Sequence, residues 1–264
     1  MSESKGKIFF AILAALLLLS GSIILLYPSL NGLWVDYTMR RNAEAFRSYV
    51  VLSQGVPEQE ASHVVNPQPE PMQPQSQLPS EHPQLWLDMK AYNEDIFREG
   101  QESLSNPTAY EKSSFRLSDY GLETEVFGVL SIPRLSLEMP IYLGASKQNM
   151  ANGAAIMGQT SLPIGGDNTN CVIAGHRGYN GASYFRYIDK LKVGDLVSIT
   201  NLWETLTYRV CEIKIIDPHD VTEILIQPGR ELLTLLTCHP YASGGRQRYV
   251  VYCERVESPE AKKS

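Results

Sequence analysis

The sequence predicts an all-β protein, a closed eight-stranded β-barrel with short helices, preceded by an N-terminal transmembrane helix. Three features predict this: short strand-like runs broken by proline and glycine after residue 126, an uncharged apolar stretch near the N-terminus, and a segment rich in proline and glutamine between them. Short runs of β-branched and aromatic residues between turn residues are typical of β-sandwiches and barrels. A closed barrel also leaves no sheet edge exposed, which favours the closed form.

The apolar stretch is long enough to cross a membrane. From Ile8 to Leu26 no residue is charged, and this length at about 1.5 Å per residue spans about 28 Å, close to the hydrocarbon thickness of a bilayer. Trp34 and Tyr37 follow at interfacial distance. A cleaved signal peptide would have a shorter apolar region and a small-residue cleavage site. We expect an uncleaved, single-pass anchor in the cell membrane, with the N-terminus in the cytoplasm and the rest of the chain outside.

The segment after the anchor changes composition abruptly. Residues Val35 to Leu52 predict a juxtamembrane helix. Between Pro57 and Pro83 lie seven of the sixteen prolines, interleaved with Gln, Glu and Ser. Such a composition buries too little apolar surface to fold, so it predicts an extended tether. Residues Gln84 to Gly100 return to helical spacing. Their predicted apolar stripe consists of Leu85, Met89, Tyr92, Ile96 and Phe97.

Strand-like runs fill the remainder of the chain. The clearest are 127–132, 137–142, 169–175, 196–200, 204–216, 234–238 and 249–253. The predicted parts are therefore a cytoplasmic N-terminus and transmembrane anchor (1–34), a juxtamembrane helix and tether (35–83), an N-terminal helix with a following segment (84–125), the β-barrel (126–256) and a polar tail (257–264).

Three reactive side chains stand at predicted strand ends. Cys238 ends an apolar strand and is followed closely by Pro240, which stops the strand. His176 follows the strand that begins at Thr169, and Arg248 directly precedes the last strand. A thiol, an imidazole and a guanidinium at strand ends are the parts needed for acyl transfer through a thioester.

Other cysteines and neighbouring residues compete for these roles. Cys171, Cys211 and Cys253 lie inside runs dense in Val and Ile, so we interpret them as buried core residues. His239 adjoins the nucleophile, but consecutive strand residues point to opposite faces, which disfavours it as the base. Arg246 competes with Arg248, and its alternative role is that of a solvated loop charge.

Composition excludes several function classes. A net charge of -6 gives no basic surface for nucleic acid. The sequence contains no phosphate-binding loop and no paired-cysteine zinc spacing. We therefore expect no cofactor and no metal.

The residues around Cys238 resemble the sortases, the cysteine transpeptidases of Gram-positive cell surfaces, whose signature is Thr-Leu-x-Thr-Cys with a later Arg and an earlier His. The resemblance covers about Leu85 to Arg255 and is strongest to class C, the pilus-assembling sortases. It rests on the segments 131–133, 137–142, 158–166, 174–178 and 235–238. It implies the sortase type of barrel. Many class C members carry a second transmembrane helix at the C-terminus, whereas this chain ends in a polar run, which leaves one predicted anchor.

The resemblance also implies a reaction. Cys238 would attack the Thr carbonyl of a Leu-Pro-x-Thr-Gly-like sorting signal, His176 would act as general acid and base, and Arg248 would orient the substrate or stabilise the oxyanion. The implied partners are the sorting signals of surface proteins or pilins and an acceptor amine, a pilin lysine or a peptidoglycan peptide. Two alternatives are a housekeeping sortase that attaches proteins to peptidoglycan, and a sortase-like barrel that only binds sorting-signal peptides.

Class C sortases typically cover the active site with a lid built on Asp-Pro followed by an aromatic residue. At the matching place this chain has Asn106, Pro107 and Thr108, with Tyr110 two residues on; we call these four residues the candidate lid. Asn cannot form the ionic contact and Thr cannot fill an aromatic slot, so we expect anchoring weaker by about 1–3 kcal/mol. The alternative is an ordinary loop that leads into the barrel.

Overall fold

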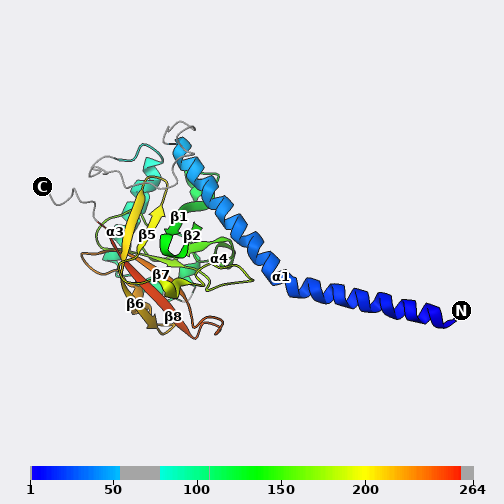
Figure 1. Cartoon of the computed structure of the whole chain (residues 1–264). Coiled ribbons are helices and arrows are strands. Elements are labelled where there is room, and N and C mark those ends of the chain that lie inside the picture. Colours follow the sequence, from blue (N-terminus) through cyan, green and yellow to red (C-terminus); the bar gives the residue numbers. More distant parts are fainter. Residues whose placement is uncertain (1, 54–77, 107, 257–264) are drawn as a thin grey trace.

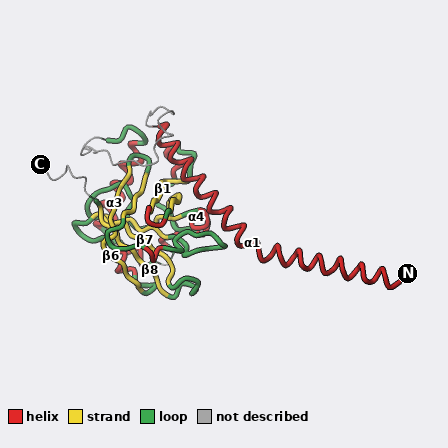
Figure 2. The backbone as a smooth tube through the Cα atoms, in the orientation of Figure 1, coloured by secondary structure: helices red, strands yellow, loops and turns green. Residues whose placement is uncertain are grey.

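The computed structural model describes residues 2–53, 78–106 and 108–256. Its centre is a closed barrel in the strand order β1-β2-β3-β4-β7-β8-β6-β5, which confirms the predicted fold class. Figure 2 shows the strands in the middle of the molecule with helices and loops around them. Most of the predicted tether, the polar tail 257–264 and Pro107 lie outside the described residues.

Seven of the strands coincide closely with the predicted runs, and one was not predicted. The strands are β1 (Val126–Ile132), β2 (Leu137–Leu143), β3 (Ala154–Ile156), β4 (Thr169–Ala174), β5 (Leu196–Thr200), β6 (Thr205–Ile216), β7 (Glu231–His239) and β8 (Gln247–Arg255). The unpredicted strand, β3, has three residues, two of them alanine, and so lacks a strand-like composition. It closes the barrel by pairing in parallel with β2 and antiparallel with β4.

The short helices lie between and around these strands. They are α3 (Pro83–Arg98), α4 (Lys147–Asn152) and the single turns η1 (Glu102–Ser105), η2 (Ala109–Glu111), η3 (Leu117–Tyr120), η4 (Pro133–Leu135), η5 (Ile188–Lys190) and η6 (Val221–Ile224).

The buried face of α3 differs from the prediction at two positions. Phe97 is 38% exposed, whereas Asn93 is buried in the stripe. Asn93 donates to the carbonyl of Leu162 at 3.0 Å and accepts from its N–H at 2.7 Å. Because both polar ends of its amide are paired, burial of this side chain carries little penalty. Hydrophobic spacing alone does not detect such a residue.

One continuous helix, α1 (Ser2–Ser53), takes the place of the separate anchor and juxtamembrane helices that the sequence suggested. From Phe9 onward it is long and apolar enough to cross a membrane. Figure 1 shows its N-terminal part projecting away from the barrel and its C-terminal part lying along it. On the C-terminal part, Met39, Ala43 and Phe46 are buried against the barrel. The helix continues because barrel contacts stabilise residues beyond the apolar stretch.

Candidate active site

Cys238 and Arg248 face each other across two paired strands. They are direct partners in the antiparallel register of β7 and β8. Nη1 of Arg248 lies 3.9 Å from Sγ of Cys238 and donates to the carbonyl of Gly245 at 2.8 Å. Directly opposed residues on neighbouring strands project from the same face of a sheet. The strand pairing therefore holds the guanidinium beside the thiol.

His176 reaches the same end of the barrel through the parallel pairing of β4 with β7. The N–H of Gly175 donates to the carbonyl of Leu236 at 3.1 Å, and the buried Thr237 hydroxyl donates to the carbonyl of Gly175 at 2.6 Å. His176 follows Gly175 as Cys238 follows Thr237. Because neighbouring strands lie about 4.8 Å apart, this register places the imidazole-bearing residue next to the thiol-bearing one. The strand pairing thus brings the three residues predicted from the sequence to the same end of the barrel.

Two tyrosines that the sequence analysis missed surround His176. The Tyr179 ring stacks on the imidazole with centroids 4.6 Å apart and planes 22° apart, and the Tyr184 ring meets it edge-on at 5.6 Å. Burial lowers the pKa of His176 below its ordinary value, because a charged imidazolium loses hydration there. The neutral imidazole is therefore favoured. The aromatic residue three positions after the histidine was the available sequence signal.

His239 belongs to a different group of side chains. Its Nδ1 accepts from Nη1 of Arg177 at 2.8 Å, and its ring packs against Tyr249 with centroids 5.7 Å apart. Arg177 is buried and also pairs with Asp189 at 3.1 Å. Since Cys238 and His239 are consecutive residues of β7, their side chains leave the strand on opposite faces. This arrangement directs His239 away from the thiol.

Arg246 lies on the exposed part of the loop between β7 and β8. Gly245 is the closer neighbour of the thiol, since a Cβ added there would lie 3.2 Å from Sγ of Cys238 and 3.0 Å from Nη1 of Arg248. Its positive φ of 81° suits glycine. The sequence analysis did not identify this contact.

All four cysteines are free. Cys171 and Cys253 are buried as predicted, and burial raises the pKa of both thiols. Cys211 is only partly buried, contrary to the core interpretation. The buried residues before it on β6 are Leu206, Tyr208 and Val210, so the regular alternation of the strand turns Cys211 to the outer face.

Among the described residues of the candidate lid, Tyr110 packs on the outer face of the barrel. The side-chain oxygen of Asn106 accepts from the N–H and the hydroxyl of Thr108, at 3.1 and 3.2 Å. The carbonyl of Tyr110 accepts from the backbone of Ala145 and Gly158, each at 2.9 Å. We name the apolar group around Tyr110 the outer cluster. It contains Leu104, Met157, Val172, Ala174 and Ile224, with Tyr110 and Leu236 packed against it.

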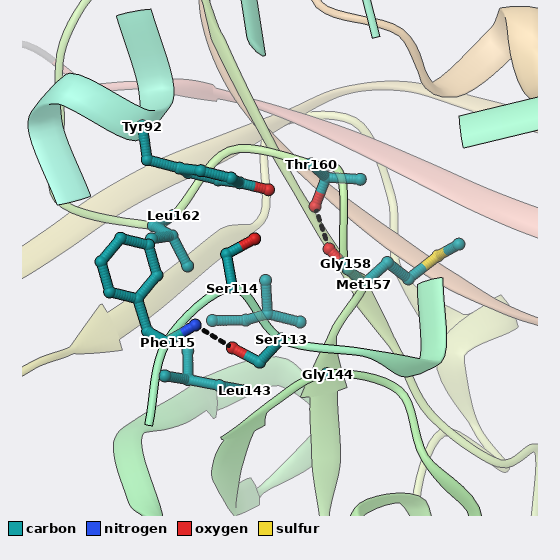
Figure 3. A pocket seen from close by; sticks show the side chains of 11 residues that line it. Tyr92, Ser113, Ser114, Phe115, Leu143, Gly144, Met157, Gly158, Thr160 and Leu162 are labelled. Carbon is teal, nitrogen blue, oxygen red and sulfur yellow. Dashed lines mark hydrogen bonds between the residues drawn. The ribbon is translucent and has the colours of Figure 1, made fainter. Parts of the chain in front are cut away.

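A small pocket lies apart from the three predicted site residues. Figure 3 shows it between Tyr92 of α3, Phe115 and Leu162, with Met157 on its far side. Cys238, His176 and Arg248 do not line it. Within the described ranges, no cluster of three His, Cys, Asp or Glu side chains could hold a metal ion.

Comparisons with known proteins agree with this geometry. Residues 130–256 match the sortase domain family. Sortase D of Bacillus subtilis is 30% identical over 131 residues, which cover 49% of this chain and 63% of that protein. The chain thus spans less than two thirds of the length of this curated relative.

Solved structures align over more of their length. Sortase C1 of group B Streptococcus (GBS) pilus island 1 has a TM-score of 0.62 at 27% identity, covering 86% of this chain and 96% of that one. Sortase C of Streptococcus pneumoniae is 32% identical with a TM-score of 0.53, covering 67% of this chain and 95% of that one.

Proposed function

The chain belongs to the sortase family, and we propose that it is a membrane-anchored cysteine transpeptidase that joins pilin subunits. The observation that carries the proposal is the opposition of Cys238 and Arg248 across β7 and β8, with His176 brought alongside by β4. A protein that only bound peptides would not need a thiol, an imidazole and a guanidinium at one barrel end. The fold and these three residues therefore favour catalysis over mere binding.

The first half-reaction forms a thioester. The sulfur of Cys238 attacks the carbonyl carbon of the threonine in a Leu-Pro-x-Thr-Gly-like signal, and the Thr–Gly amide bond breaks. His176 takes the proton of the Cys238 thiol as the sulfur attacks and gives it to the departing glycine amine. Arg248, held 3.9 Å from the sulfur, stabilises the negative oxygen of the tetrahedral intermediate or orients the signal.

The second half-reaction transfers the acyl group to an amine. The acceptor nitrogen attacks the thioester carbon, a new amide bond forms, and the thiolate departs. His176 takes the proton from the attacking amine and passes it to the departing thiolate, which returns the site to its starting state. We propose a pilin lysine as the acceptor, since the structural neighbours include a sortase of a streptococcal pilus island and a pilus-related sortase C. No oxidant or cofactor enters either step.

We further propose that α1 anchors the enzyme in the cell membrane with the barrel on the outer side. Its N-terminal part carries large apolar side chains that are exposed, among them Leu18, Ile24 and Leu25, each more than 70% exposed. A lipid bilayer would cover this apolar surface. Exposure of so long an apolar surface to water would be unfavourable. The extracellular orientation follows from the substrates proposed above.

Acyl-enzyme capture tests the activity. The purified chain is mixed with a sorting-signal peptide, and the thioester is detected by mass spectrometry before and after hydroxylamine. We expect an adduct on Cys238 that Cys238→Ala abolishes. Cys211→Ala is the matched control, because Cys211 is also partly buried but lies inside β6. An adduct that survives Cys238→Ala would overturn the proposal.

The acceptor is identified by a competition assay. The acyl-enzyme is offered a lysine-containing pilin peptide and a peptidoglycan stem peptide at equal concentration. Preferential transfer to lysine supports pilin joining. Preferential transfer to the stem peptide would instead identify a housekeeping enzyme with the same nucleophile.

For the candidate lid we propose a weakly anchored gate. Tyr110 packs against the outer cluster, as Leu236 does; the cluster includes Ala174. Ala174 and Leu236 come two residues before His176 and Cys238 along the chain. The segment therefore borders the reactive end of the barrel. Asn106 engages Thr108 within the segment itself and so does not contribute an ionic contact to the site. A gate held by apolar packing and two backbone hydrogen bonds, without an ionic contact, should open readily.

The rate at which a small thiol reagent alkylates Cys238 measures how readily this gate opens. Introducing Asn106→Asp together with Thr108→Trp restores the class C pattern and should slow alkylation. Cys211→Ala in both forms removes the competing thiol. Equal rates in the two forms would show that the segment does not control access.

A further inference from the structure

The helix that leaves the predicted membrane span packs directly on the loop that carries the proposed acid and base. We name residues 176–184 the histidine loop. Gly32 of α1 lies very close to the backbone of Gly181. A Cβ added to Gly32 would overlap the backbone of the histidine loop, and a Cβ added to Gly181 would overlap the backbone of α1. Backbone contact of this kind requires glycine on both sides. Gly32 lies six residues after Leu26, the last residue of the apolar stretch.

Polar contacts flank the glycine pair on both sides. The side-chain amide of Asn31 donates to the carbonyl of Asn180 at 3.0 Å. The carboxylate of Asp36 accepts from the N–H of Ser183 at 3.2 Å and from its hydroxyl at 3.4 Å. Together with the Gly32 contact, these bonds hold the histidine loop at three successive points. One face of α1 therefore determines the position of the loop tip.

The loop tip is coupled to the imidazole through Tyr179. Tyr179 and Ala182 exchange backbone hydrogen bonds of 3.2 and 2.9 Å, which close the loop into a small hairpin. From this hairpin the Tyr179 ring stacks on His176. Tyr184, at the other end of the loop, supports the imidazole edge-on and donates its hydroxyl to the carbonyl of Ala151 at 2.7 Å.

We propose that Tyr179 is a positioning residue for His176, and that docking of α1 at Gly181 sets the position of Tyr179. The inference rests on the proposed role of His176. An imidazole attached at the end of a strand can rotate about two side-chain bonds, and a stacked ring removes much of that freedom. A displacement of about 1 Å in a catalytic group can slow a reaction by about 100-fold. Contact with the anchor helix thus becomes part of the active site.

Tyr179 variants test the stacking contact. In the full chain, reconstituted in lipid nanodiscs, Tyr179→Ala should lower kcat for peptide cleavage by about 10- to 100-fold with little change in KM. Tyr179→Phe keeps the ring and should restore the rate. An equal loss of kcat in the Ala and Phe variants would exclude stacking as the cause, and unchanged kcat in Tyr179→Ala would overturn the proposal.

Two glycines of α1 provide a test substitution and a matched control for the helix contact. Gly32→Ala adds a methyl group against Gly181, whereas Gly21→Ala adds the same group where no atom lies within 4 Å. We expect Gly32→Ala to reduce kcat by about 10-fold and Gly21→Ala to leave it unchanged. Equal rates in the two variants would overturn the role of α1.

A double-mutant cycle tests whether the two contacts are coupled. If α1 acts through Tyr179, then Gly32→Ala should have no further effect in a Tyr179→Ala background. Additive losses would show that α1 acts by another route. Failure of the proposed function is distinguishable, because it would appear as an active His176→Ala enzyme, whereas failure of this inference would leave His176 essential and Tyr179 dispensable.

Discussion

Replacing Gly245 with alanine is expected to impair catalysis far more than stability. Gly244 and Gly245 both have positive φ, 72° and 81°. An alanine in this region costs about 1–2 kcal/mol, partly offset by about 0.4–1 kcal/mol from the reduced entropy of the unfolded chain. The net loss of stability should therefore be about 1 kcal/mol at either position.

The two glycines differ in what a methyl group would meet. At Gly244 no atom lies within 4 Å, whereas at Gly245 the methyl group would lie 3.0 Å from Nη1 of Arg248 and 3.2 Å from Sγ of Cys238. The guanidinium is the end of a flexible side chain and would move away. Loss of one charge-stabilising donor costs about 10²- to 10³-fold in kcat. We expect that loss for Gly245→Ala only.

Peptide cleavage and urea unfolding, measured on both variants, separate the two effects. Gly244→Ala is the control for backbone strain, because it shares the loop and the sign of φ. Similar unfolding free energies with a large difference in kcat would support the placement of Arg248. Equal kcat values for the two variants would refute the reasoning, since the contact with the Arg248–Cys238 pair would then have no consequence.

Three further outcomes are expected. Arg248→Lys should lower kcat by at least about 10-fold because an ammonium lacks the planar fork of donors, whereas Arg246→Ala should be nearly normal; the reverse pattern in a cleavage assay would contradict our assignment. Thr237→Val leaves the Gly175 carbonyl without its donor and should cost about 1–3 kcal/mol in urea unfolding, while Thr237→Ser should cost less; equal losses would indicate a packing effect. Because the pKa of His176 is lowered on folding, the unfolded chain binds more protons below about pH 6.5, so acidification through that value should reduce the stability of the native protein relative to His176→Asn; a pH-independent difference would contradict this.

The catalytic candidates could be predicted from the sequence because each depends on local information. Cys238 ends an apolar strand before Pro240, and Arg248 begins the next one, so a hairpin brings them together with little need for long-range knowledge. The alternation of β7 likewise separated His239 from Cys238. The unbroken apolar run from Ile8 to Leu26 was similarly visible from composition alone.

Features that depend on pairing between distant segments could not be predicted. The composition of the three-residue strand β3 does not predict a strand. The strand forms because β2 and β4 lie on either side of it. Asn93 is buried because Leu162 satisfies its amide. Each outcome depends on a partner that lies far away along the chain.

The sequence by itself determined the barrel class, the apolar anchor segment and the identity of the thiol, imidazole and guanidinium, because periodicity and strand ends are encoded over a few residues. Only the tertiary structure decided that the chain segments carrying His176 and Cys238 reach the same end of the barrel, through the parallel pairing of β4 and β7. It also decided that α1 continues past the apolar stretch and meets Gly181. The physical reason is that these contacts gain their stability from burial between remote segments, which no local pattern of residues records.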